Sequence, residues 1–256
     1  MLVAVAAFFG LLFGSFATVA AYRIPRRETI KDGRSKCPNC DAQIRAYDNI
    51  PLLSYLILRG KCRDCGFRIP IKYPLIELAT AVLFGLAAWK FDVTIAALAY
   101  AGFSWVLVVL TVIDLEHKLL PNRVVFPAFI AGWALLIADA IVEDRGEQIA
   151  DALFGAFIFG GIFFVIAFAV PKGMGMGDVK LAFVLGTFLG YVGGVETVLA
   201  GMFLSFLVGG VTGIIWMIAA GGDRKMAVPF GPFLALGTIL GIYLGQDIAD
   251  AYLGLF

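Results

Sequence analysis

The 256-residue chain is 61% hydrophobic and only 15% charged, whereas an ordinary soluble domain is roughly 45–50% apolar and about 25% charged. This composition excludes a water-soluble globular protein. The net charge is +1, from 20 Lys and Arg against 19 Asp and Glu, so no global excess of positive charge indicates a nucleic-acid partner. We expect the lipid bilayer as surroundings and no nucleic acid.

Long apolar stretches, separated by charges, Pro and Gly, recur along the whole sequence. A membrane-spanning helix needs about 20 mostly apolar residues, and eight stretches qualify. They run approximately over residues 2–22, 75–90, 93–113, 124–142, 152–171, 179–194, 196–220 and 228–246. The pattern predicts an all-α membrane protein with about eight transmembrane helices, of which the second and sixth are the shortest.

One polar segment, residues 23–74, interrupts this pattern and holds 12 of the 20 basic residues. If the first span begins outside, 18 of the 20 basic residues lie in cytoplasmic loops or at a cytoplasmic helix end, as the positive-inside rule favours. The basic residues follow the first apolar run instead of preceding it, so we expect a retained first span and not a cleaved signal peptide. The predicted parts are a first transmembrane helix (1–22), a cytoplasmic domain (23–74) and a seven-helix membrane core (75–256).

Glycine recurs at every fourth position in several predicted spans. Small residues at this spacing let two helix backbones approach closely. We expect tight helix packing, and no catalytic role, at these positions: Gly10 and Gly14; Gly186, Gly190 and Gly194; Gly237, Gly241 and Gly245.

All four cysteines lie in the polar segment, as the two C-x2-C pairs Cys37/Cys40 and Cys62/Cys65. This spacing is typical of a four-thiolate zinc site, and four protein ligands leave no open position, so the zinc would be structural. The alternatives are disulfides, which a reducing cytoplasm disfavours, or unrelated thiols. A segment this small lacks a secure core, so metal binding would supply folding free energy. Residues 50–56 are apolar enough to lie at the membrane interface.

Two acids stand at the edges of apolar spans. Asp114 ends the third span, and Asp178 opens the sixth after a glycine-rich stretch. Burying a carboxylate at such a boundary costs several kcal/mol unless it is paired, hydrated or protonated, so each acid is a functional candidate. The alternative for each acid taken singly is an interfacial ion pair with Lys118 or Lys180.

The predicted topology places both carboxylates at the cytoplasmic face and at similar depth. Two acids within a few Å share a proton and titrate as a unit, so one can act as general base toward water and the other as general acid toward a carbonyl. That is the chemistry of aspartic proteases. Glu116 and the single histidine, His117, are expected in the following loop, and Glu77 is expected to cap a helix start, with a polar cofactor pocket as the alternative.

An ordered set of motifs resembles the bacterial type IV prepilin peptidases, a family of G-x-G-D membrane aspartyl proteases. The resemblance covers essentially the whole chain. Its elements are Phe13-Gly14-Ser15-Phe16, Tyr22-Arg23-Ile24-Pro25, the two C-x2-C pairs, Tyr47-Asp48-Asn49-Ile50-Pro51-Leu52-Leu53-Ser54-Tyr55, Tyr73-Pro74-Leu75-Ile76-Glu77, Ile113-Asp114 through Leu120-Pro121-Asn122, and Gly175-Met176-Gly177-Asp178-Val179-Lys180-Leu181.

The resemblance implies a multi-pass inner-membrane enzyme whose catalytic pair is Asp114 and Asp178. Its substrates would be prepilins and pseudopilins, cut on the cytoplasmic side after a glycine that precedes the hydrophobic helix. Members with the four cysteines are similar to the bifunctional type, which then methylates the new N-terminus from S-adenosylmethionine. Asn122 stands where many relatives have Asp, outside the catalytic pair. The residues that hold the methyl donor are not readable from the sequence, and neither is the oligomeric state.

Two alternatives to the dual enzyme differ in what they require of the sequence. A peptidase without methyltransferase activity is disfavoured by the intact set of cysteines. A transporter with a zinc-stabilised cytoplasmic cap would carry its acids near mid-membrane and in repeat-related positions. Both acids instead share one boundary, and no internal repeat is present.

Overall fold

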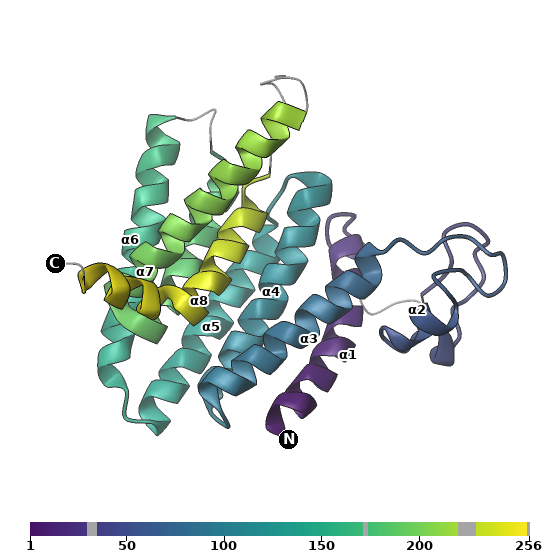
Figure 1. Ribbon diagram of the computed structural model, residues 1–256, viewed down its shortest axis with the longest axis horizontal. Helices are drawn as coiled ribbons and strands as arrows, with labels where there is room; N and C mark the ends of the chain where they lie inside the picture. Colours follow the sequence, from purple (N-terminus) through teal and green to yellow (C-terminus); the bar gives the residue numbers. More distant parts are fainter. Residues whose placement is uncertain (30–34, 171–173, 220–228, 255–256) are drawn as a thin grey trace. The chain divides into compact units, whose positions relative to one another are not determined.

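The computed structural model describes residues 1–29, 35–170, 174–219 and 229–254, and these residues are almost entirely helical (Figure 1). The all-α prediction is confirmed. Within this part of the chain, extended pairing is confined to two isolated β-bridges, Lys36 with Gln43 and Lys61 with Arg68. The elements are α1 (Leu2–Arg23), the short 3-10 helix η1 (Ala46–Asp48), α2 (Leu53–Ile57), α3 (Lys72–Phe91), α4 (Ile95–His117), α5 (Asn122–Val142), α6 (Gly146–Ala169), α7 (Met176–Ala219) and α8 (Gly231–Leu253).

Seven helices in the described residues are long and apolar enough to cross a membrane, namely α1 and α3 to α8. The predicted spans 179–194 and 196–220 both fall in α7, whose backbone is non-helical at Gly193 and Gly194. Gly194 has φ 65° and ψ −158°, a conformation that is essentially restricted to glycine, so it separates two helical stretches. The count of eight spans stays a prediction. The ends of three predicted spans, at residues 171, 220 and 228, lie outside the described residues.

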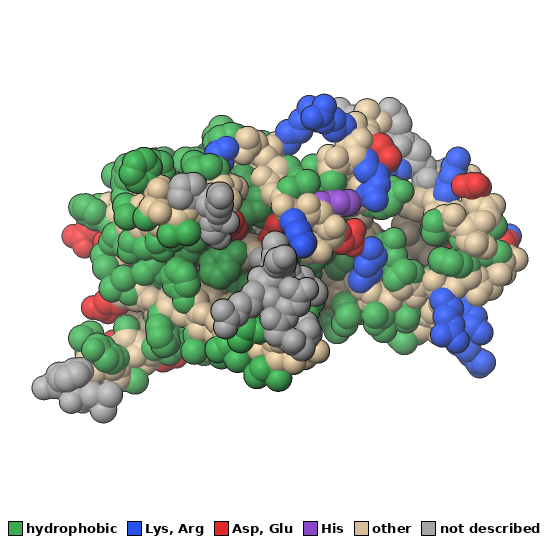
Figure 2. All heavy atoms as spheres, turned by 90° about the horizontal axis from the view of Figure 1, so that it is seen from above, with side chains coloured by type: hydrophobic (Ala, Val, Ile, Leu, Met, Phe, Trp, Pro, Cys, Tyr) green, Lys and Arg blue, Asp and Glu red, His purple; other side chains and the backbone are tan. Residues whose placement is uncertain are grey.

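Large apolar side chains cover much of the molecular surface, as Figure 2 shows for one face. Phe168, Ile141 and Ile218 are each more than 70% exposed. Contiguous apolar surface of this extent is unfavourable in water but normal against lipid tails. The surface therefore agrees with the transmembrane assignment made from composition.

The chain divides into two compact units, Met1–Val93 and Thr94–Phe256. In the first, α1 packs along α3. A Cβ atom at Gly10 would lie 2.6 Å from the Cα of Ala81, and one at Gly14 would lie 2.6 Å from the Cα of Glu77. These two glycines therefore permit the close backbone approach that their spacing predicts.

Gly10→Ala is expected to destabilise the chain by about 2 kcal/mol, because the added methyl group would overlap backbone atoms of α3 that have no room to move. Gly102→Ala is the matched control, since Gly102 is also helical but has no atom within 4 Å of an added Cβ. The thermal unfolding midpoint in detergent should fall for Gly10→Ala and stay level or rise for Gly102→Ala. Equal midpoints for the two variants would contradict the packing role.

In the second unit, α7 packs against α6 and α8, and α4 packs against α5 and α8. The Phe188 ring of α7 stacks on Phe103 of α4 at a centroid distance of 3.9 Å. The Tyr100 hydroxyl donates to the Phe188 carbonyl oxygen at 2.6 Å. These contacts fix how far α4 and α7 are shifted along each other.

A buried carboxylate links three helices of this unit, α4, α5 and α7. Asp139, at the end of α5, has no exposed surface. It accepts hydrogen bonds from the Ala96 backbone N–H, at the start of α4, and from the Tyr191 hydroxyl of α7, both at 2.7 Å. Arg145 completes the set at 3.5 Å. This network and the Phe188 contacts hold α4 and the first part of α7 side by side in antiparallel directions. The end of α4, with Asp114, therefore lies next to the start of α7, with Asp178.

Asp139→Ala is expected to lower the free energy of unfolding by about 3 kcal/mol, because the Ala96 amide, the Tyr191 hydroxyl and the Arg145 charge all lose their acceptor. Thermal unfolding of the purified protein in detergent measures the loss. Asp250→Ala, an exposed acid near the end of α8, is the control and should unfold like the wild type. A wild-type midpoint for Asp139→Ala would show that the network contributes nothing.

Candidate active site and metal centre

Asp114 lies in the last turn of α4, and its side chain is 5% exposed. One carboxylate oxygen, Oδ2, accepts a hydrogen bond from the backbone N–H of Gly231 at 3.0 Å. Gly231 is the first residue of α8, and the N-terminal end of a helix favours a negative charge beside it. The start of α8 therefore places a backbone donor beside Asp114 and holds the orientation of its carboxyl group.

Asp178 lies in the first turn of α7 and is partly buried. Its backbone N–H donates to the Gly175 carbonyl oxygen at 3.1 Å, which closes the turn that starts the helix. The charge of Asp114 acts on the Asp178 carboxyl. The structure thus brings together two carboxyl groups that are 64 positions apart in the chain.

Leu120 packs beside Gly177 and Gly231, which adjoin the two carboxyl groups. A Cβ atom at Gly177 would lie 3.1 Å from the Cβ of Leu120, and one at Gly231 would lie 3.3 Å from its Cδ2. The segment after α4 is therefore held between the start of α7 and the start of α8.

In the part of the chain that the structure describes, Asp114 and Asp178 form no ion pair with Lys118 or Lys180, which the alternative interpretation requires. Among the described residues, Lys180 instead donates to the Asn122 side-chain oxygen at 3.1 Å and lies 5.6 Å from the centre of the Phe126 ring. Glu116 and His117 belong to the last turn of α4, not to the loop in which the sequence placed them, because the helix continues to Lys118 with its left-handed backbone. Within the described residues, the buried His117 Nε2 has no hydrogen-bond partner.

Gly231 is a site residue that the sequence analysis did not find. A Cβ atom there would lie 2.7 Å from Asp114 Oδ2, so a larger residue would push the carboxylate away from its position on the backbone N–H. The signal in the sequence is the pair Gly231-Pro232 at the opening of an apolar run, because Pro is common in the first turn of a helix.

Gly231→Ala is expected to lower peptidase activity by about tenfold or more, because the methyl group would displace the Asp114 carboxylate by an appreciable fraction of an ångström. The unfolding midpoint should stay within a few degrees of the wild type. Gly213→Ala, a helical glycine of α7 with no atom within 4 Å of an added Cβ, is the matched control. Full activity of Gly231→Ala would contradict the positioning role of this residue.

The four cysteines form one cluster. Their Sγ atoms all lie within 4.8 Å of one another, and all four thiols are free of disulfides. The Sγ atoms of Cys37 and Cys65 are 3.8 Å apart, and a tetrahedral site with Zn–S bonds of about 2.3 Å requires about 3.8 Å between sulfur atoms. The cluster therefore has the size and ligand type of a four-thiolate metal site.

The two C-x2-C pairs have the same backbone geometry. In the first pair, the Cys37 N–H donates to the Ala42 carbonyl oxygen, and the Asp41 N–H donates to the Cys37 carbonyl oxygen. In the second pair, the Cys62 N–H donates to the Phe67 carbonyl oxygen, and the Gly66 N–H donates to the Cys62 carbonyl oxygen. Asp41 (φ 54°) and Gly66 (φ 70°) occupy the equivalent left-handed positions. Each turn thus presents two sulfurs on one side.

The electrostatics of the cluster favour a bound cation. The backbone N–H of Phe67 lowers the pKa of the Cys65 thiol to about 7. The Ala42 N–H acts in the same direction on Cys40, but the neighbouring thiols of Cys65 and Cys37 raise the pKa of Cys40 to about 12. Four crowded sulfurs do not all ionise by themselves, whereas a metal ion stabilises the thiolates together.

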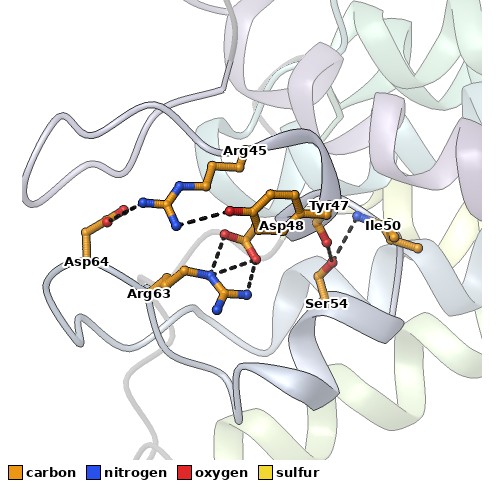
Figure 3. A network of polar contacts seen from close by, with 7 residues as sticks. All are labelled: Arg45, Tyr47, Asp48, Ile50, Ser54, Arg63 and Asp64. Atoms are coloured by element: carbon orange, nitrogen blue, oxygen red, sulfur yellow. Dashed lines mark hydrogen bonds and ion pairs between the residues drawn. The ribbon is translucent and has the colours of Figure 1, made fainter.

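A polar network joins residues that lie next to the two cysteine pairs in the sequence (Figure 3). Arg63 forms a two-point ion pair with Asp48, with a shortest distance of 2.6 Å, and this hydrogen bond holds the pKa of the Asp48 carboxyl below its usual range. Arg45 contacts the Tyr47 hydroxyl at 3.1 Å and Asp64 at 3.3 Å. The segment that follows the first cysteine pair is thereby connected to residues within the second pair.

Glu77 connects this segment to α3. Its Oε2 accepts a hydrogen bond from the Leu52 backbone N–H at 2.8 Å, just before the start of α2. Leu52 has φ 59°, which is unfavourable for a non-glycine residue, so the bond holds a strained turn. Glu77 thus positions the chain that enters α2. The sequence analysis expected Glu77 to cap the start of its own helix, and the structure shows no such cap.

These features define a class of protein: a multi-pass helical membrane protein with a four-cysteine cluster that could hold a metal ion and a pair of carboxyl groups at the ends of two packed helices. Residues 8–91 match the bacterial peptidase A24 N-terminal domain, and residues 101–218 match the type IV leader peptidase family. The two matches together cover most of the chain.

Curated relatives extend the likeness over nearly the full length. A prepilin leader peptidase/N-methyltransferase of Pseudomonas aeruginosa is 35% identical, covering 95% of this chain and 91% of the relative. One of the same name from Bacillus subtilis is 34% identical, covering 96% and 95%, and one from Legionella pneumophila is 32% identical, covering 96% and 92%. No solved structure matches the chain. The chain belongs to the type IV leader peptidase family and is a membrane peptidase.

Proposed function

We propose that the chain removes the leader peptide from prepilins and pseudopilins at the cytoplasmic face of the inner membrane and then methylates the new N-terminus. The peptidase activity is proposed from the proximity of Asp114 and Asp178, at one end of α4 and α7, in a member of this family. The relatives' shared name, which joins leader peptidase and N-methyltransferase, supports the second activity.

The two carboxyl groups have different surroundings, which assigns their roles. Asp114 accepts the Gly231 N–H and acts as general base: it takes a proton from water, whose oxygen then bonds to the scissile carbonyl carbon. Asp178, protonated, gives its proton to the carbonyl oxygen. When the tetrahedral intermediate collapses, the C–N bond breaks and the leaving amine receives the proton that Asp114 had taken, while the carbonyl oxygen returns its proton to Asp178, so the pair regains its starting charge.

The orientation follows from charge. We assign residues 1–22 as the first span, 23–74 as a cytoplasmic domain and 75–256 as the peptidase core of seven spans, because 18 of the 20 basic residues then lie on the cytoplasmic side. The ends of α4 and α7 that carry Asp114 and Asp178 face the same side. The scissile bond of a substrate with an apolar helix in the bilayer would lie at that depth.

We assign the metal as zinc, held by Cys37, Cys40, Cys62 and Cys65. The four thiolates and their spacing suit a tetrahedral d10 ion. When bound, the ion supplies folding free energy to a segment with few buried apolar side chains and takes no part in peptide hydrolysis.

S-adenosylmethionine enters as the methyl-donating co-substrate that the second activity requires. We assign no residues to its site. The second candidate is a peptidase without methyltransferase activity. Two observations favour the dual enzyme: the intact cysteine cluster and the relatives' name, which includes both activities. A transporter with a zinc-stabilised cap requires acids near mid-membrane, whereas Asp114 and Asp178 lie at helix ends.

The test uses the purified chain in detergent with a prepilin and labelled S-adenosylmethionine. We expect release of the leader and transfer of one label to the mature N-terminus. A prepilin whose glycine before the cleavage site is replaced by a bulky residue is the control and should yield neither product. Cleavage without label transfer would select the second candidate, and no cleavage of the first substrate would overturn the proposal.

A further inference from the structure

The short helix α2 carries an apolar face that the described residues of its own domain leave exposed. Leu53, Leu56 and Ile57 are 50%, 70% and 64% exposed. Their spacing of three and four residues places them on one side of the helix, within an arc of about 100°. Ser54, 6% exposed, lies on another side, where its hydroxyl bonds to the backbone of Tyr47 and Ile50. The apolar face is therefore directed away from the domain.

A hydrogen bond sets the depth of this face relative to a membrane span. The Leu52 N–H, directly before α2, bonds to Glu77 of α3 at 2.8 Å. Glu77 lies in α3 two residues after Leu75, the first residue beyond the cytoplasmic domain 23–74, which corresponds to about 3 Å along the helix axis. Helices that lie in the membrane interface bury their apolar face about 5–10 Å into the boundary between headgroups and acyl chains. The Leu52–Glu77 bond therefore holds the start of α2 at the boundary of the span, from which its apolar face can reach this depth.

The charges that follow α2 suit an anionic surface. Residues 59–72 contain five basic residues and one acid, Asp64, which is already paired with Arg45. Arg59 and Lys61 come directly after the helix, and both are exposed. Basic residues beside an apolar helix face attract anionic headgroups while the face enters the acyl region.

From these three observations we propose that α2 is an interfacial membrane anchor, whose face Leu53, Leu56 and Ile57 inserts beside anionic lipid headgroups held by Arg59 and Lys61. The anchor, together with the Leu52–Glu77 bond, holds the cysteine domain against the bilayer. The binding partner is the lipid surface itself.

The test places a photo-crosslinking residue on this face in the full-length protein. Leu56→p-benzoylphenylalanine and the control Gln43→p-benzoylphenylalanine, at an exposed position of the same domain, are reconstituted in lipid nanodiscs of phosphatidylcholine with about 30% phosphatidylglycerol. Metal content equal to that of the wild type confirms that both variants are folded. Mass spectrometry identifies each adduct.

We expect lipid adducts at position 56 to exceed those at position 43 by about tenfold. Omitting phosphatidylglycerol, or adding Arg59→Glu and Lys61→Glu, should lower the yield at position 56 several-fold. Equal lipid adducts at the two positions would overturn the anchor. A yield that is indifferent to both charge changes would overturn the role of anionic lipid. Adducts to an added prepilin peptide in place of lipid would assign the face to substrate docking instead.

Discussion

Replacing either Asp114 or Asp178 by Asn is expected to lower the rate of prepilin cleavage by about 10³-fold or more, because each variant removes one proton-transfer group while keeping the size of the side chain. In Asp114→Asn the amide side chain would still accept the Gly231 N–H through its carbonyl oxygen, so the start of α8 stays in place. Leader release from a purified prepilin, followed over time, measures the effect.

The matched control is Glu116→Gln, which removes a carboxylate two residues from Asp114 on an exposed side of the same helix. It should cleave at nearly the wild-type rate. Both Asp variants should keep the wild-type unfolding midpoint and still transfer labelled methyl groups to a substrate that is already cleaved. Cleavage by both variants at wild-type rates would refute the carboxylate pair, and loss of methyl transfer as well would indicate that the two reactions share the site.

The wild-type pair should also produce a bell-shaped dependence of kcat/KM on pH, because one carboxyl group must be ionised and the other protonated. In each single variant only the remaining carboxyl group titrates, so one limb of the bell should disappear from the residual activity. A pH profile that keeps both limbs in a single variant would argue against assigning the titrations to this pair.

Replacing Cys37 and Cys62 together by Ser is expected to abolish zinc binding, from one ion per chain to none, since only two of the four sulfurs remain. Zinc contributes about 10–16 kcal/mol to the folding of small domains of this type, so residues 23–74 should unfold. Elemental analysis measures the metal, and limited proteolysis measures the unfolding of the segment. The same cleavage pattern should appear when the wild-type protein is treated with a strong chelator.

Asp41→Asn provides the control for this experiment. Asp41 lies in the first cysteine turn without contributing a sulfur, and Asn tolerates its left-handed backbone. This variant should keep its metal and its resistance to protease. Unchanged metal content in the double cysteine variant would eliminate the four-thiolate site, and protease resistance without metal would show that the domain folds without it.

The sequence by itself determined the features that depend on local composition. Runs of apolar residues predict helices of membrane-spanning length, because the backbone must satisfy its hydrogen bonds within each span. Two C-x2-C pairs predict a cluster because each turn, by itself, points two sulfurs the same way. The positions of Asp114 and Asp178 at the ends of apolar runs could likewise be recognised in the sequence. The family resemblance rested on such motifs.

Only the tertiary structure decided what depends on contacts between distant segments. The Phe188 contacts and the Asp139 network align α4 with α7 and bring Asp114 near Asp178. The pair Gly231-Pro232 marks a helix start in the sequence, but it does not give the role of Gly231, which is the approach of one N–H to a carboxylate 117 residues away. Glu77 similarly has its partner, Leu52, 25 residues upstream. Local sequence sets hydrophobicity and turn geometry, whereas the pairing of polar groups is chosen by packing, which no local pattern records.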